Sequence, residues 1–170
     1  MVTMNFSNRI SQTLHDEHCA TVALMERLEK IIARYSRGAP ADINDSAVAK
    51  LLLDLSAGME DEVLRHFSFE EDCLFTYLGA IGDEAIGAHL KDDHTVMRPI
   101  GIRLAGLARE AAATGFDETK WEAFRRVGQE LCERLLAHVQ KEEMALLPLI
   151  ENSMDAETEA RLVEEYSEIR

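Results

Sequence analysis

The stretch RHFSFEEDCLF, residues 65–75, places His66 and Glu70 four residues apart in a segment that otherwise has the pattern of a buried helix. The stretch AHVQKEEMALL, residues 137–147, repeats the arrangement with His138 and Glu142. Four residues turn an α-helix by about 400°, so each histidine lies one turn from its glutamate on nearly the same line. One such pair is common on solvated faces. Two pairs on separate helices indicate a shared role in the interior.

Apolar residues repeat at steps of three and four along most of the chain, which is typical of amphipathic helices. The pattern predicts four long helices, over about residues 7–35, 46–78, 83–113 and 117–147. Their short connections indicate an all-α fold, an antiparallel four-helix bundle with up-down-up-down topology over about residues 7–150. A short C-terminal fifth helix is predicted over about residues 155–168. Because no linker breaks the pattern, residues 1–170 are expected to form a single domain.

Four residues are expected to mark boundaries or breaks in these helices. Asp45 or Ser46 is expected to cap the second helix at its N-terminus. Pro99 lies inside the third helix and is expected to kink or locally unwind it, because proline lacks a backbone donor and clashes with the preceding turn. Pro148 is expected to interrupt the fourth helix.

The composition limits the classes of partner. The chain has 170 residues, 32 of them acidic and 18 basic, and its net charge of −14 argues against nucleic acid and anionic membranes as partners. No run approaches the roughly 18 apolar residues of a membrane-spanning helix, and no secretory leader is expected. Cys19, Cys73 and Cys132 are far apart and odd in number, so we expect reduced thiols in a cytoplasmic protein.

The inward stripe of every long helix carries a histidine. His18 lies on the first helix, His66 with Glu70 on the second, His94 on the third, and His138 with Glu142 on the fourth. Burying these groups unpaired would cost several kcal/mol each. A shared cation removes that cost, since neutral imidazole and carboxylate are metal ligands. Core histidines that form hydrogen bonds without any metal are the alternative.

Four further residues lie near these stripes. His15 precedes His18 by three residues and could be a ligand, a hydrogen-bonding neighbour of a ligand or a boundary residue. His89 lies about 140° from His94 around the helix and is expected at the surface. Glu71 and Glu143 step about 100° off the stripe, so we expect both to be solvated.

The segments LHDEH, HFSFEE, DDH and HVQKEE, in this order over about residues 10–150, resemble the hemerythrin-like (HHE cation-binding) family. The resemblance implies a non-haem di-iron centre, with two iron ions bridged by carboxylates inside the bundle. It implies terminal ligands at His66 and His138, bridging ligands at Glu70 and Glu142, and a further ligand from the third helix at His94. On the first helix, the oxygen-carrier pattern points to His18 and the pattern of the iron–sulfur repair branch points to His15, so both are candidates.

The sequence departs from the oxygen carriers at two places. Their third helix has two histidines four residues apart, whereas HLKDDH spaces them by five. Their last carboxylate is an aspartate five residues after the histidine, whereas Glu142 follows His138 at four. Reversible oxygen carriage is therefore not expected, and the pattern is more similar to the branch linked to iron–sulfur repair and nitrosative stress. We do not expect the cysteine-containing N-terminal domain typical of that branch, because the first predicted helix begins at about residue 7.

Three functions are consistent with this pattern. The first is a di-iron protein that binds or senses O₂, NO or iron, acting as a metal- or gas-binding protein rather than an enzyme. A sensor of this kind would need a separate protein partner. The second is a di-iron redox enzyme or an iron donor in iron–sulfur cluster repair, and the third is a metal-free structural bundle. Zinc or manganese could replace iron in purified samples.

Overall fold

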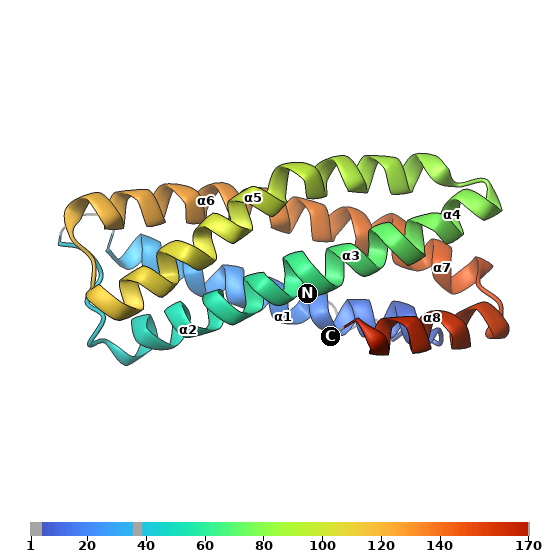
Figure 1. Ribbon diagram of the computed structural model, residues 1–170, viewed down its shortest axis with the longest axis horizontal. Coiled ribbons are helices and arrows are strands. Elements are labelled where there is room, and N and C mark those ends of the chain that lie inside the picture. The colour runs from blue at the N-terminus through green and yellow to red at the C-terminus, as the bar shows by residue number, and fades with distance from the viewer. Residues whose placement is uncertain (1–4, 36–38, 170) are drawn as a thin grey trace.

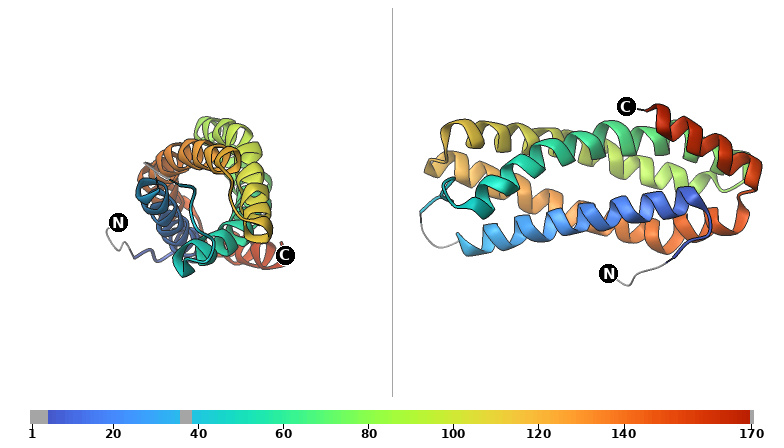
Figure 2. Two further views of the ribbon diagram at one scale, coloured as in Figure 1. Left: turned by 90° about the vertical axis from the view of Figure 1, so that its left-hand side faces the viewer. Right: turned by 90° about the horizontal axis from the view of Figure 1, so that it is seen from below.

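The computed structural model describes residues 5–35 and 39–169 and is helical through nearly all of them, with no strand in these ranges. Four long helical segments lie side by side, and the end-on view shows them arranged around a common axis (Figures 1 and 2). In chain order, these segments are α1 (Arg9–Arg34), then α2 (Ser46–Asp61), η1 (Glu62–His66), α3 (Phe67–Phe69), η2 (Glu70–Leu74) and α4 (Phe75–Ile81), then α5 (Glu84–Thr114), and finally α6 (Glu118–Lys141), η3 (Glu142–Leu146) and α7 (Leu147–Ser153). The segments alternate in direction, which confirms the predicted four-helix bundle.

The fifth helix, α8 (Ala156–Glu168), packs along one end of the bundle (Figures 1 and 2). Asp155 caps it by accepting a hydrogen bond from the backbone N–H of Thr158 at 2.8 Å. Leu162 is fully buried among the apolar residues of that end, and the ring of Tyr166 lies 4.6 Å from that of Phe69. The predicted C-terminal helix is therefore part of the packed structure.

The helix caps follow the sequence, but one of the prolines does not act as expected. Asp45, rather than Ser46, caps α2 by accepting from the backbone N–H of Ala47 at 2.8 Å. Helix α5 continues through Pro99 without unwinding, although its axis changes direction near the middle in Figure 1. The predicted interruption at Pro148 is wrong, because the chain stays helical to Ser153.

The reason lies in the turn before Pro148. The backbone N–H of Leu147 bonds to the carbonyl of Glu142, five residues back, so η3 is a π-helical turn. Backbone hydrogen bonding returns to the α-helical pattern directly after Leu147. Pro148 therefore removes a donor where the hydrogen-bond register is already changing, at the first turn of α7, where proline is tolerated.

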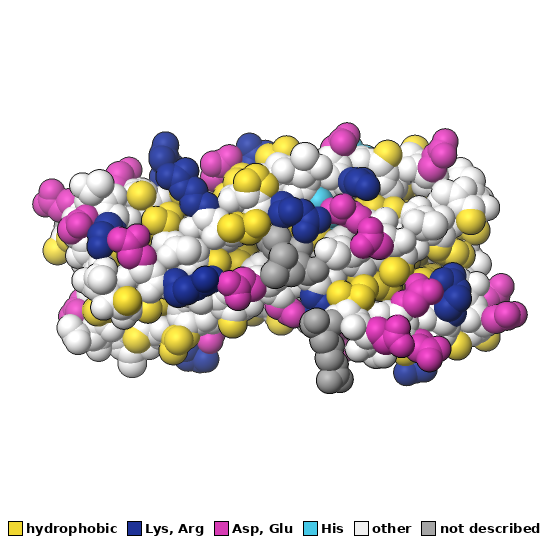
Figure 3. Space-filling model, viewed as in Figure 1, with side chains coloured by type: hydrophobic (Ala, Val, Ile, Leu, Met, Phe, Trp, Pro, Cys, Tyr) yellow, Lys and Arg dark blue, Asp and Glu magenta, His cyan; other side chains and the backbone are white. Residues whose placement is uncertain are grey.

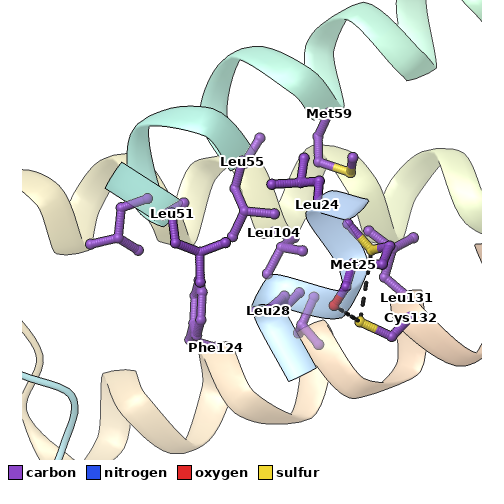
Figure 4. Packing of buried hydrophobic residues seen from close by; sticks show 14 of the residues in the cluster. Leu24, Met25, Leu28, Leu51, Leu55, Met59, Leu104, Phe124, Leu131 and Cys132 are labelled. Carbon is purple, nitrogen blue, oxygen red and sulfur yellow. Dashed lines mark hydrogen bonds between the residues drawn. The ribbon is translucent and has the colours of Figure 1, made fainter. Parts of the chain in front are cut away.

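Two apolar clusters fill the bundle, one on each side of a polar layer. Along α1, Leu14 belongs to the smaller cluster and Met25 to the larger one, with His18 between them. Figure 4 shows the packing of the larger cluster, to which α1, α2, α5 and α6 all contribute leucines. The same order recurs on the other helices, so the histidines and glutamates form a single layer across the bundle. That layer is the candidate site.

Many charged side chains lie on the outer surface. Figure 3 shows acidic and basic side chains interspersed over one face, with small apolar areas between them. No helix in the described part of the chain is both long and apolar enough to cross a bilayer.

Candidate metal centre

Six of the predicted residues converge in the polar layer, and each residue is no more than 1% exposed. They fall into two groups whose ligand atoms all lie within 4.8 Å of one another. The groups are His18, His66, Glu70 and Glu142, and His94, His138, Glu70 and Glu142. Both glutamates belong to both groups, so the geometry offers two neighbouring cation positions with two carboxylates in common.

Glu142 turns one oxygen toward each group. Its Oε2 lies 3.0 Å from His18 Nε2, and its Oε1 lies 3.0 Å from His138 Nε2. Despite these distances, neither oxygen has a hydrogen-bond partner of normal geometry among the described residues. Atoms that approach closely without hydrogen bonding are those expected of ligands aimed at a common ion.

Glu70 repeats this arrangement on the opposite helix. Its Oε1 lies 3.3 Å from His66 Nε2 and its Oε2 lies 3.3 Å from His94 Nε2. Both oxygens are buried and lack a hydrogen bond within the described structure. A buried carboxylate left in this state costs several kcal/mol, and a bound cation removes that cost.

The two histidines of the second group also face one point. His94 Nε2 and His138 Nε2 lie 3.0 Å apart. Two ligand atoms each about 2.1 Å from one metal ion are separated by roughly 3.0–3.4 Å in octahedral or tetrahedral geometry. The observed separation therefore fits two imidazoles on the same ion.

Each of the four histidines is oriented by a carboxylate on its outer nitrogen. A carboxylate only accepts hydrogen bonds, so in the neutral imidazole Nδ1 carries the proton and the Nε2 lone pair faces the centre. The pairs are His18 Nδ1 to Glu143 Oε1 at 2.7 Å, His66 Nδ1 to Glu17 Oε2 at 2.8 Å, His94 Nδ1 to Glu71 Oε1 at 3.1 Å, and His138 Nδ1 to Asp93 Oδ2 at 3.2 Å. We call Glu143, Glu17, Glu71 and Asp93 the supporting carboxylates.

Protons neutralise the centre when no cation is bound. Burial alone lowers the pKa of His18, but the carboxylates of Glu142 and Glu143 outweigh it and raise this pKa to about 9. Burial likewise opposes ionisation of Glu142, yet His138 and His18 hold its pKa well below the usual range. Cation binding must therefore displace protons from imidazole.

The expectation that Glu71 and Glu143 are solvated is wrong. Their side chains are 18% and 8% exposed and bond to histidines. Each follows a glutamate that begins a π-helical turn, η2 at Glu70 and η3 at Glu142. The turn is wider than an α-helical one, so the next residue rotates less far from the inward face. π-helical turns of this kind are frequent at functional sites.

His15 is the one candidate that the structure keeps apart from both groups. Its Nδ1 donates to Glu143 Oε2 at 2.9 Å, and its Nε2 lies 3.7 Å from Cys19 Sγ. Glu143 thus holds both histidines of α1, and only His18 faces the centre. His89 is exposed, as predicted.

The sequence interpretation missed the supporting carboxylates. Their positions in the sequence could have identified them, because each is the immediate neighbour of an inward-facing residue. Glu17 precedes His18, Asp93 precedes His94, Glu71 follows Glu70, and Glu143 follows Glu142.

Comparison with known families agrees with this geometry. The family profile described as the hemerythrin HHE cation binding domain matches residues 9–150, with a second match over residues 86–170. A search among curated proteins finds no match to the chain. The first match spans the whole bundle and all six converging side chains, and together with the buried His/Glu cluster it indicates a metal-binding protein. The chain belongs to the hemerythrin HHE cation-binding domain family.

Proposed function

We propose that this protein holds a carboxylate-bridged pair of non-haem iron ions and binds a small ligand such as O₂ or NO there. The observation that carries the proposal is the orientation of Glu70 and Glu142, each with one oxygen toward each ligand group. His18 and His66 would hold one ion, and His94 and His138 the other.

The donor set supports iron. Imidazole nitrogen and carboxylate oxygen suit iron as well as zinc, and thiolate is absent from both groups. Each ligand group has four protein donors, which would fill all four positions of a tetrahedral zinc ion and leave none for a small ligand. Non-haem iron sites commonly keep open positions beside histidine and carboxylate ligands, so bound iron would supply both redox chemistry and room for a small ligand.

The surroundings restrict what can reach the centre. The six side chains are almost completely buried, and apolar clusters lie on both sides of the layer. The ring of Phe67 stacks on His94, with centroids 3.9 Å apart. This enclosure excludes bulk water and large substrates, which favours a diatomic gas ligand over an organic substrate. As a sensor, the protein would signal through a separate protein partner.

The metal-free alternative leaves too many buried atoms unsatisfied. His18 Nε2, His66 Nε2 and both oxygens of Glu70 and Glu142 lack hydrogen bonds within the described structure. A role as an iron donor in cluster repair is the second candidate, and the acidic cavity considered in the next subsection favours it.

Metal content and absorption spectra test the proposal. Protein expressed with sufficient iron and purified without oxygen should contain two iron ions per chain, and O₂ or NO should change its ultraviolet-visible spectrum. Glu70→Gln should lower the iron content, whereas Glu60→Gln, an exposed acid paired with Arg109, should not. At most one ion in the unaltered protein, with no loss in Glu70→Gln, would contradict a bridged pair.

A further inference from the structure

Glu62 is a buried carboxylate that the dinuclear centre does not use. The residue is 6% exposed and belongs to neither ligand group. Its Oε2 accepts a hydrogen bond from the hydroxyl of Thr21 at 2.8 Å, while Oε1 has no partner among the described residues. An ionised oxygen in this position is costly unless a cation or water meets it.

Glu62 lines a cavity of about 140 Å³ between α1 and α2. Asp61 and Glu17 also line it, and their side chains are 57% and 23% exposed. Ala20 and Gly58, one from each helix, keep the space open. Carboxylates therefore stand at successive depths, from the surface at Asp61 to the interior at Glu62.

The inner end of this cavity adjoins the metal centre. Glu62 and His66 are the first and last residues of the π-helical turn η1, so they lie about one turn apart on the same segment. Glu17 lines the cavity and also accepts the hydrogen bond from His66 Nδ1 at 2.8 Å. Glu17 and Glu62 thus connect the cavity with a ligand of the centre through polar side chains.

The charge of the cavity favours cations. Arg65 pairs with Glu17 and with Asp61, each at 2.7 Å. Three carboxylates therefore face one guanidinium, and none of the described cations pairs with Glu62. At about 30 Å³ for each water molecule, the volume accommodates a partly hydrated ion. Carboxylate and hydroxyl oxygens are donors that divalent cations accept while keeping some of their water.

We propose that Glu62 and Thr21 form a transient site for a divalent cation, on the path by which iron enters and leaves the dinuclear centre. This inference rests on the proposed function, and it assigns Glu62 a role in transfer rather than in the bound state. The two oxygen donors would hold a hydrated ion only weakly, and the groups that would receive it are Glu70 and the inward Nε2 of His66, since Nδ1 of that ring already bonds to Glu17.

Kinetics of metal uptake and release test the path. Stripped protein is mixed anaerobically with Fe²⁺ in a stopped-flow instrument, and release is measured with excess chelator. Glu62→Gln should slow both rates about tenfold, since a carboxylate that concentrates a cation raises its rate of entry by that order. The final content should remain two ions with an unchanged spectrum. Glu60→Gln removes the same charge from the exposed side of the helix and should leave both rates unchanged.

A second variant keeps every carboxylate. A Cβ at Gly58 would lie 3.0 Å from Leu24 Cδ2, so Gly58→Ala narrows the cavity and should also slow both rates. If Glu62→Gln does not fold, the rates of Gly58→Ala test the path instead.

Three outcomes would contradict the proposal. Rates of uptake and release in both variants equal to those of Glu60→Gln would overturn the path while leaving the centre intact. Loss of an ion at equilibrium in Glu62→Gln would make Glu62 a ligand and also overturn it. Unaltered protein that takes up no metal would remove the proposed function together with the path.

Discussion

Replacing the two histidines of α1 one at a time tests the assignment of the ligands. His18 Nε2 faces the centre, and its removal leaves His66 and the two shared glutamates in that group. Three donors hold an ion more weakly than four, and the second group keeps all its donors. We therefore expect His18→Ala to contain close to one iron ion per chain, against two in the unaltered protein.

The same substitution at His15 should have a smaller effect. His15 bonds to Glu143 Oε2, whose other oxygen holds His18 Nδ1, so His15 acts on the centre only through Glu143. Loss of such an outer partner typically weakens metal affinity by 10- to 100-fold, or about 1.4–2.8 kcal/mol. His15→Ala should thus keep two ions and bind one of them less tightly.

Anaerobic titration of stripped protein with Fe²⁺, in competition with a chelator of known affinity, measures both quantities. His89→Ala, an exposed histidine on α5, is the matched control and should behave as the unaltered protein. Full iron content in His18→Ala together with loss of an ion in His15→Ala would refute the reasoning. It would mean that α1 is rotated by about 60° from the orientation described.

Three further predictions concern stability and support. The pKa of His18 is raised to about 9, so protonated His18 stabilises the cation-free fold fully below about pH 6.5. This contribution should disappear as the pH rises through 9, and urea unfolding at a series of pH values would measure the loss. Metal should raise the melting temperature while the stripped form stays helical by circular dichroism, and identical melting curves would contradict binding by the folded bundle alone. Asp93→Asn should retain two ions but lose about 10- to 100-fold in affinity, because it weakens the hydrogen bond that orients His138.

The sequence predicted most of the fold and the inward-facing side chains, because both depend on one helical period. The three–four repeat that placed Leu14 and Met25 in the core also placed His18 between them. Where the α-helical period is uniform, the spacing of residues is enough to predict which side chains face the core.

The sequence failed where the period changes. The π-helical turns at Glu70 and Glu142 shift the backbone register, and a constant step of 100° per residue cannot reproduce them. The errors at Glu71, Glu143 and Pro148 all follow from these turns. A π-helical turn has poor intrinsic stability, so its position depends on tertiary contacts rather than on local propensity.

The supporting carboxylates form a closed ring that combines sequence position with bundle topology. In a four-helix bundle, a residue directed at the axis has a sequence neighbour turned toward an adjacent helix, by about 100° in an α-helix and by less in a π-helical turn. The neighbour precedes the inward residue on α1 and α5 and follows it on the two segments of opposite direction, so all four turn the same way around the axis. Each segment thus supplies the carboxylate for the histidine of the next: Glu17 for His66, Glu71 for His94, Asp93 for His138, and Glu143 for His18. Because each histidine is held by a carboxylate of another segment, the orientation of all four histidines depends on assembly of the whole bundle.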